Sequence, residues 1–284
     1  MRITILSSLV AIIFSLNASA TDFTHLLEEG AKKAIELAEH RNSGNNGASQ
    51  STYAPDLYSK AQLSQSFGAC LDQFPNHDTS KVTSAFSQSM NPTALCSDGF
   101  AVWYSKKAKA PLVVVEKLNA ARINDAKGEQ RTDEFYPDPR LKQGERAELD
   151  DFKGSGYDRG HNSPAADATN PHQMAQTFAL SNMFMQNQTN NRKLWSKIEG
   201  DTRKYAFRAS GDVFVFTGPL FLDNQLKTMG ENRVWVPSHL FKLVYDATTR
   251  KSWAFVYENN DHPSHLAPIS YEQFVAVSGL KLLP

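Results

Sequence analysis

The chain has 284 residues, of which 40% are hydrophobic, and it carries 30 basic and 30 acidic side chains. This is the composition of an ordinary globular protein, and the length is enough for one large domain with a substantial core. The formal charge of zero counts against a domain that holds nucleic acid by bulk electrostatic attraction, since such domains are usually basic. Contact with a polyanion would therefore need a local cluster of arginines.

Residues 1–20 have the layout of a secretory signal peptide. One basic residue, Arg2, precedes a mostly apolar run at 3–16, and small residues follow at 18–20. The alternative is an N-terminal membrane anchor, but the apolar run is shorter than the ~20 residues that a bilayer span needs. We therefore expect cleavage of the signal peptide and a secreted or periplasmic protein with no membrane attachment after cleavage.

The segment 21–52 combines an amphipathic helix with a flexible linker. Apolar residues recur at helical spacing from Thr24 to about Arg41, with charged residues between them. Residues 42–51 contain no apolar residue larger than alanine, which is typical of a linker. The helix is expected either to dock on the main domain or to contact a partner, and the sequence leaves both alternatives open.

Two cysteines, Cys70 and Cys96, are expected to form one disulfide bond. In an oxidising compartment such a pair most simply bridges, and the loop that it closes corresponds to about 3 kcal/mol of chain entropy. The bridge would attach an N-terminal extension, 53–98, made of helical turns and loops, to a domain that continues to residue 284. Without a CxxC pair the cysteines make a poor zinc site, so a metal would use oxygen and nitrogen ligands.

The rest of the sequence predicts an α+β domain with a central, largely antiparallel β-sheet flanked by helices. Segments 100–104 and 111–116 have the pattern of a β-hairpin. The polar stretch 119–156 should run over the surface as loops, which commonly carry functional sites. Four further strands are expected at 213–218, 234–237, 241–245 and 253–257, and a short helix at 270–279.

The most informative region begins with the tetrapeptide Asp158-Arg159-Gly160-His161, which polar residues follow at set intervals as far as Glu199. With these intervals the chain resembles the DNA/RNA non-specific endonucleases of the ββα-metal finger superfamily, over roughly residues 100–279. The resemblance implies a ββα-metal finger active site, DNA and RNA as substrates, and products with 5′-phosphate ends. The residues that carry it are Asp158-Arg159-Gly160-His161, Ser181-Asn182, Asn190-Asn191, Trp195 and Glu199.

His161 is the expected general base. Hydrolysis of a phosphodiester needs a deprotonated water, stabilisation of charge on the phosphate oxygens and help for the leaving oxygen. A histidine with an unperturbed pKa near ~6.5 suits the first task at neutral pH. A lone histidine is more often structural, but its place in the tetrapeptide favours catalysis. With an unperturbed base, activity should fall below about pH 6.5.

By resemblance to the family, Asn191 is the one direct protein ligand of a metal ion. A neutral amide oxygen is a poor anchor for zinc but suits Mg²⁺, with Mn²⁺ as a substitute. Capping a helix is the alternative role, and spacing favours Asn190 for it. If 191–203 is one helix, Glu199 lies ~12 Å further along, which favours a water-mediated contact with the metal. Glu199 could equally pair with Arg203 one turn later.

Three further residues are placed at the site by the resemblance. Arg159 and Arg131 are expected to bind phosphate, because a planar guanidinium donates two hydrogen bonds without losing its charge. The assignment of Arg131 needs a small insertion in the alignment. Asn182 is expected to orient a loop or the histidine.

Neighbouring residues of the motif also carry expectations. Gly160 should let the chain turn before the histidine, and Asp158 could orient the histidine through its other ring nitrogen. Trp195 is expected in the core rather than against a base. The segment 183–186 replaces a Thr-Pro pair that many family members have, and as a loop beside the cleft it would affect substrate preference.

The sequence thus predicts a Mg²⁺-dependent endonuclease of low sequence specificity. One alternative is a catalytically inactive nuclease-fold protein that binds nucleic acid, but neither the expected base nor the expected metal ligand is missing. A second alternative is a metal-dependent phosphodiesterase acting on a non-nucleic substrate, to which the near-neutral charge lends slight support.

Overall fold

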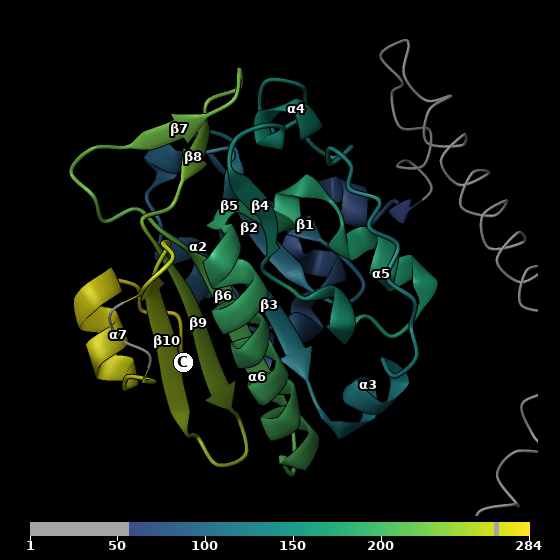
Figure 1. Ribbon diagram of the computed structural model, residues 1–284. Coiled ribbons are helices and arrows are strands. Elements are labelled where there is room, and N and C mark those ends of the chain that lie inside the picture. The colour runs from purple at the N-terminus through teal and green to yellow at the C-terminus, as the bar shows by residue number, and fades with distance from the viewer. Residues whose placement is uncertain (1–56, 264–266) are drawn as a thin grey trace, which may run out of the picture. The chain divides into compact units, whose positions relative to one another are not determined.

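Six strands form the central sheet in the order β1-β2-β3-β6-β9-β10, and every neighbouring pair is antiparallel. The computed structural model describes residues 57–263 and 267–284 (Figure 1). The sheet confirms the expected α+β class. Its strands are β1 Pro92–Cys96, β2 Ala101–Ser105, β3 Ala110–Leu118, β6 Val213–Leu220, β9 His239–Asp246 and β10 Ser252–Glu258.

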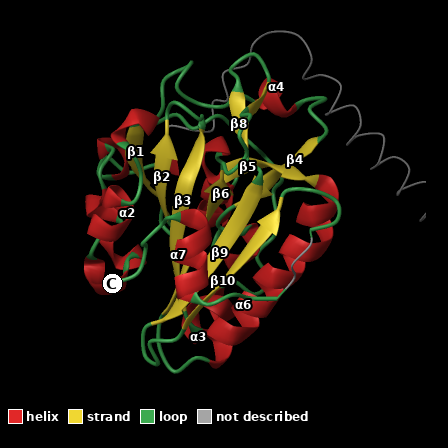
Figure 2. Cartoon of the chain, turned by 90° about the vertical axis from the view of Figure 1, so that its left-hand side faces the viewer, coloured by secondary structure: helices red, strands yellow, loops and turns green. Residues whose placement is uncertain are grey.

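Helices cover both faces of this sheet (Figures 1 and 2). Successive side chains of a strand point to opposite faces, so Phe241 and Val244 of β9 lie on different sides. Phe241 packs against Phe274 of α7, with 5.2 Å between ring centroids. Val244 belongs to a buried cluster with Ala206 of α6. The two covering helices are α7, Tyr271–Ser278, and α6, Ser196–Arg208.

The helix expected at 270–279 is α7, and its ends have clear local causes. Ser270 and Gln273 form a capping box in which each side chain accepts a hydrogen bond from the other residue's backbone N–H. Gly279 ends the helix with a φ of +72°, a conformation that a residue with a side chain rarely adopts.

A two-stranded sheet precedes α6 in the chain and carries the tetrapeptide. Strand β4 (Tyr157–His161) pairs antiparallel with β5 (Met183–Asn187). A π-helical turn, Asn190–Trp195, then leads into α6. Two strands followed by a helix is the expected ββα arrangement. The single α-helix expected over 191–203 is wrong in its first turn, so the α-helical distance from Asn191 to Glu199 does not apply. Such π-turns are rare and often lie at functional sites.

The expected disulfide between Cys70 and Cys96 is present, with a sequence separation of 26. Short helical turns lie on both sides of Cys70, as expected. Cys96, however, ends strand β1, where only turns and loops were expected. The segment 92–95 lacks the alternation of a typical strand, and its proline is tolerated because β1 is an edge strand. The turns are η2 Gln62–Ser64, η3 Phe67–Ala69, η4 Leu71–Gln73, η5 Pro75–His77, α2 Ser80–Ser84 and η6 Gln88–Met90.

The polar stretch 119–156 is mostly irregular but is not confined to the surface. Asp138 and Arg140 within it form an ion pair whose side chains are both 0% exposed. Short helices lie near both of its ends. These and the remaining elements are α3 Ala120–Asp125, α4 Leu149–Phe152, η7 Ala165–Asp167, α5 Pro171–Thr177, η8 Leu180–Asn182, β7 Lys227–Met229 and β8 Val234–Val236.

Several expectations for the N-terminal part lie outside the described residues. These are the signal peptide at 1–20, the amphipathic helix and linker at 21–52, and the first residues of the extension at 53–56. Within 57–263 and 267–284, no helix is both long enough and apolar enough to cross a membrane.

Candidate active site

The pairing of β4 with β5 sets the direction of each side chain in the tetrapeptide. His161 lies opposite Met183, and Gly160 lies opposite Phe184. Side chains alternate along a strand, so Arg159 and His161 share one face of β4 while Asp158 lies on the other. Asp158 is therefore directed away from the histidine, and the expected contact between them is not formed.

Gly160 is required for space and not for a turn. It lies within an extended strand, and a Cβ added there would come within 2.2 Å of Gln186 Oε1 and 2.8 Å of the Phe184 ring. A Cβ atom does not approach other non-bonded atoms this closely, so a larger residue would force β4 away from β5. The expectation that the chain turns at Gly160 was wrong, and the glycine instead permits close packing of the two strands.

His161 is held among aromatic rings with one ring nitrogen left without a partner. The imidazole is 5.1 Å from the Phe178 ring and 5.8 Å from the Phe135 ring. The residue is 8% exposed, and its Nε2 is buried without a hydrogen bond. Burial, aided by the positive charge of Arg131, lowers the pKa of His161 to about 3. The base is therefore neutral well below pH 6.5, which corrects the expectation of an unperturbed histidine.

The two expected arginines lie against the same rings as His161. The guanidinium of Arg159 is 4.8 Å from the Phe135 ring, and that of Arg131 is 5.0 Å from the Phe178 ring. Arg159 Nε is buried without a hydrogen-bond partner, and burial lowers the pKa of this guanidinium. Arg131 is more exposed and donates to Asp133 at 2.6 Å. The fold thus gathers two cations and an uncharged imidazole around two aromatic rings.

Asn182 lies beneath the loop that follows His161. Its Oδ1 accepts from the Ser163 N–H at 3.0 Å, and its Nδ2 donates to the Ser163 and Thr177 carbonyl oxygens, both at 2.9 Å. Asn182 is fully buried, so these contacts are formed out of solvent. This geometry favours the expected role of orienting a loop over direct contact with a substrate.

Asn191 is oriented by Asp158. The Asn191 Nδ2 donates to Asp158 Oδ2 at 2.9 Å, and Asp158 also accepts two hydrogen bonds from Arg192, at 2.7 and 2.8 Å. Holding the amide nitrogen in this way determines where the amide oxygen points. Asn190 is instead buried and bonded to Gln186 and to the Glu258 carbonyl, and it does not cap the helix.

Glu199 is half-buried on α6 and lies among charged groups. Burial raises the pKa of Glu199 to about 7, and the nearby Lys242 partly offsets this rise. The expected ion pair between Glu199 and Arg203 is not formed, because Arg203 binds Asp167 at 3.1 Å.

The oxygen donors of Asn191 and Glu199 fit a hard divalent cation, which keeps several of its own waters. In the described part of the chain no group of three His, Cys, Asp or Glu residues is placed to hold a metal ion. A site of the zinc type is therefore not built here, whereas a cation that needs few protein ligands is compatible with the residues present.

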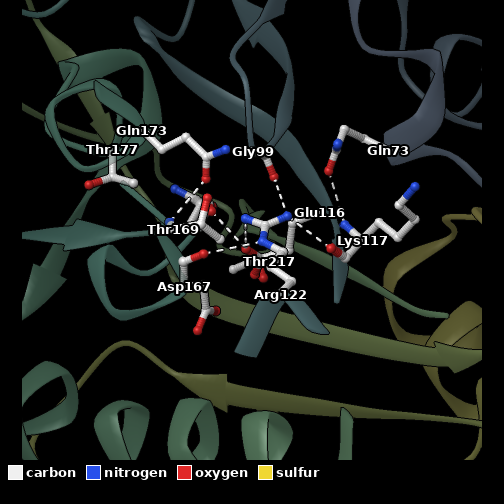
Figure 3. A network of polar contacts seen from close by, with 12 residues as sticks. Gln73, Gly99, Glu116, Lys117, Arg122, Asp167, Thr169, Gln173, Thr177 and Thr217 are labelled. Atoms are coloured by element: carbon white, nitrogen blue, oxygen red, sulfur yellow. Dashed lines mark hydrogen bonds and ion pairs between the residues drawn. The ribbon is translucent and has the colours of Figure 1, made fainter. Parts of the chain in front are cut away.

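Sequence reasoning missed a group of buried charges behind the site. Glu116, on β3, lies 3.9 Å from Arg122, which also donates to the Gly99 and Asp167 carbonyl oxygens (Figure 3). Lys242, on β9, is buried in the same region. A signal was available in the sequence for two of these charges, because Glu116 and Lys242 each follow apolar residues within a strand.

Two further expectations have clear outcomes. Trp195 is 1% exposed and packs against Phe184 at 6.2 Å, so its place in the core is confirmed. The segment 183–186 is not a loop beside the cleft: it forms β5 and is buried. An effect of this segment on substrate preference through direct contact is therefore excluded.

Comparison with known proteins identifies the family. Residues 78–281 match the model of the DNA/RNA non-specific endonuclease family. The mitochondrial nuclease 1 of Schizosaccharomyces pombe is 30% identical over 207 residues, covering 69% of this chain and 64% of that protein. Human mitochondrial nuclease EXOG is 34% identical over 162 residues, covering 53% of this chain and 43% of that protein. Human mitochondrial endonuclease G is 32% identical over 157 residues, covering 52% of each.

A solved structure supports the fold as well. A chain in the crystal structure of the EndoG/EndoGI complex matches with a TM-score of 0.59 and 26% identity, covering 66% of this chain and 84% of that chain. The chain described here spans between 43% and 64% of the length of the three curated relatives.

The names of these relatives correct the predicted location. Nuclease 1, EXOG and endonuclease G are named as mitochondrial nucleases, and this contradicts the expectation of a secreted or periplasmic protein. An apolar N-terminal run is typical of a targeting segment, but its composition alone does not determine the destination membrane. The family-model match over residues 78–281 establishes that the chain belongs to the DNA/RNA non-specific endonuclease family.

Proposed function

We propose that this protein is an endonuclease that hydrolyses phosphodiester bonds of DNA and RNA to 5′-phosphate ends with one Mg²⁺ ion. The observation that carries the proposal is the unpartnered Nε2 of His161, which is buried beside Arg131 and Arg159. A base must be unprotonated to accept a proton, and the low pKa of His161 keeps it so. The adjacent guanidinium groups suit a phosphate.

In the proposed reaction His161 Nε2 accepts a proton from a water molecule. The water oxygen forms a bond to phosphorus as the bond from phosphorus to the 3′ oxygen breaks, which leaves a 5′-phosphate. The 3′ oxygen takes a proton from solvent water to become a 3′-hydroxyl, and His161 returns its proton to solvent. Arg159 and Arg131 donate hydrogen bonds to the phosphate oxygens as negative charge develops on them. Asn182 keeps the loop after His161 in place.

Asn191 would hold the Mg²⁺ ion directly and Glu199 through a water molecule. When bound, this cation, or Mn²⁺ in its place, supplies positive charge beside the phosphate and the leaving oxygen. The family is generally metal-dependent. The support for Mg²⁺ in particular is the donor set: the amide oxygen of Asn191, whose amide nitrogen donates to Asp158, and one half-buried carboxylate.

Incubation of the purified protein with plasmid DNA and ribosomal RNA tests the proposal. Both should be degraded with Mg²⁺ or Mn²⁺ and remain intact with EDTA. The cut DNA should be sealed by a ligase without prior phosphorylation, because ligation requires 5′-phosphate ends. Asn191→Ala should raise the Mg²⁺ concentration needed for half-maximal activity, whereas the exposed Asn124→Ala should leave it unchanged.

Two outcomes would overturn the proposal. Binding of nucleic acid without cleavage would indicate an inactive nuclease-fold binding protein. Hydrolysis of a small phosphodiester such as bis(p-nitrophenyl) phosphate, with DNA and RNA left intact, would indicate a phosphodiesterase with a non-nucleic substrate.

A further inference from the structure

Glu116 is a carboxylate buried in the centre of the main sheet. It is 2% exposed on β3, in a strand whose neighbouring residues 112–115 are all apolar. Burial raises the pKa of Glu116 to about 7, which shows that the charged form is costly at this position. Packing alone would be satisfied by an apolar residue of similar volume, so the retained carboxyl group calls for a separate explanation.

Glu116 lies on the same face of the sheet as two other polar residues from the adjacent strands. Thr217 of β6 lies opposite Val114 of β3 and opposite Lys242 of β9. Residues two apart share a face, so Glu116 and Val114 point the same way, together with Thr217 and Lys242. Lys242 is 1% exposed, and its Nζ donates to Thr217 Oγ1 at 2.6 Å. Three central strands therefore present polar groups on the face that α6 covers.

These groups contact the chain directly after His161. Glu116 Oε2 accepts the Ser163 hydroxyl hydrogen bond at 2.7 Å, and Lys242 Nζ lies 3.5 Å from the Asn162 carbonyl oxygen. Asn182 binds the same two residues: its carbonyl oxygen accepts from the Asn162 N–H and Nδ2, and its side chain bonds to the backbone of Ser163. Residues 162 and 163 are thus held between η8 and the central sheet.

The position of the base depends on this segment. His161 Nε2 makes no hydrogen bond, so the direction of the imidazole is determined by the backbone at 161–163 and by the rings of Phe135 and Phe178. Misplacement of a reacting group by about 1 Å can cost roughly a hundredfold in rate. A rigid support for residue 163 therefore matters for the reaction, although it lies outside the cleft.

We propose that Glu116 is a positioning residue for phosphodiester hydrolysis, which acts by holding the Ser163 hydroxyl and thereby fixing the direction of His161 Nε2. The inference rests on the proposed function of His161. It assigns no contact with substrate or metal to Glu116.

The experiment is a double-mutant cycle with Glu116→Gln, Ser163→Ala and the double variant. Each single change should lower kcat by about tenfold, in the range found for groups that orient catalytic residues. KM for DNA should stay within about twofold, because the phosphate-binding arginines are untouched. The double variant should lose no more than the worse single variant, because Ser163→Ala removes the contact that Glu116→Gln weakens by replacing a carboxylate acceptor with a neutral amide. Glu272→Gln on exposed α7 serves as the matched control and should leave kcat unchanged.

A second readout does not depend on cleavage. In the metal-free protein the His161 imidazole proton resonance should shift in Glu116→Gln and in Ser163→Ala, because the ring moves relative to Phe178, and should stay in place in Glu272→Gln. Additive losses of kcat, or losses confined to thermal stability with an unmoved His161 resonance, would show that Glu116 is only structural. If Glu116→Gln does not fold, Ser163→Ala decides the question alone.

The two proposals fail in different ways. A wild-type protein that cleaves no nucleic acid contradicts the proposed function, whatever the resonance does. A wild-type protein that cleaves, with kcat unchanged in both single variants, contradicts the positioning role only.

Discussion

Two arginines of this protein, Arg140, which is buried, and Arg159, which is half-buried, have opposite environments. Arg140 is paired with Asp138 through three hydrogen bonds, donates to the Cys96 carbonyl oxygen and lies 3.9 Å from the Tyr58 ring. Burial alone would lower the pKa of Arg140, but Asp138 raises it above the ordinary value. Arg159 is partly buried with an Nε that has no partner, and burial lowers its pKa.

This difference distinguishes a residue that supports the fold, Arg140, from a residue of the candidate site, Arg159. A buried charge with all its partners provides a fixed structure and no capacity to bind anything else. A buried donor or acceptor without a partner carries a cost in free energy, and a ligand that supplies the missing partner removes that cost. Arg159 Nε and His161 Nε2 share this property on one face of β4, and we infer that a phosphate and a water molecule supply their partners.

The largest expected effect is that of His161→Ala. Loss of a general base typically costs 10²–10⁴-fold, so kcat should fall by about 10³-fold. Circular dichroism should show a folded protein, because the imidazole makes no hydrogen bond through Nε2. His262→Ala, at an exposed position, is the matched control. Full activity in a folded His161→Ala protein would remove the basis of the proposed site.

The second effect concerns stability. Arg140→Met leaves Asp138 buried without its partner, and breaking a buried pair in this way typically costs about 3–5 kcal/mol. Urea unfolding should show this loss, while kcat per folded molecule stays close to wild type. An unchanged free energy of unfolding would show that the Arg140–Asp138 pair does not stabilise the fold, contrary to what its hydrogen bonds indicate.

Arg159→Met should have the opposite effects to Arg140→Met, with a large loss of activity and little loss of stability. A charge-assisted hydrogen bond to phosphate contributes about 1.5–3 kcal/mol, so kcat/KM should fall by roughly 10–100-fold. Stability should hardly change, because the replaced Nε has no partner in the folded protein. Arg208→Met, on the exposed end of α6, is the control. A loss of stability as large as that of Arg140→Met, with kcat/KM unchanged, would show that Arg159 supports the fold and does not bind phosphate.

The smallest expected effect is that of pH. The pKa of His161 is lowered to about 3, so the free enzyme keeps a neutral base throughout the range from pH 7 to 5. In Glu199→Gln, which lacks the carboxyl group whose pKa is raised to about 7, kcat/KM at saturating Mg²⁺ should change by less than about threefold in this range. The unfolded chain binds a proton at His161 below about pH 6.5 and the folded chain does not until about pH 3, so His161 contributes a loss of stability as pH falls. A drop in kcat/KM centred on pH 6.5 would show that the histidine is solvated.

Local pattern was enough to predict most of the sheet. Segments such as 213–218 and 253–257 are rich in β-branched and aromatic residues, and they form β6 and β10. Strand β1 was missed because 92–95 has no alternation and is ordered by its pairing with β2. The π-helical turn at 190–195 was missed because its sequence is compatible with an ordinary helix.

The residues proposed for the site were also found in the sequence, but their environments were not. The family resemblance carried by the tetrapeptide and its downstream partners led us to propose His161, Asn191 and Glu199 without any structure. The pKa of His161 could not be predicted, because Phe135 and Phe178, which exclude water from it, are not adjacent to it in the chain.

By itself the sequence determined the family, the fold class, the disulfide pair and the residue types of the site, since each depends on short-range pattern or on spacing. Only the tertiary structure decided the protonation state of the base, the close approach that requires Gly160, and the contact from Glu116 through Ser163 to the histidine loop. These depend on burial and on contacts between strands far apart in the chain. Residue types alone do not encode such distances.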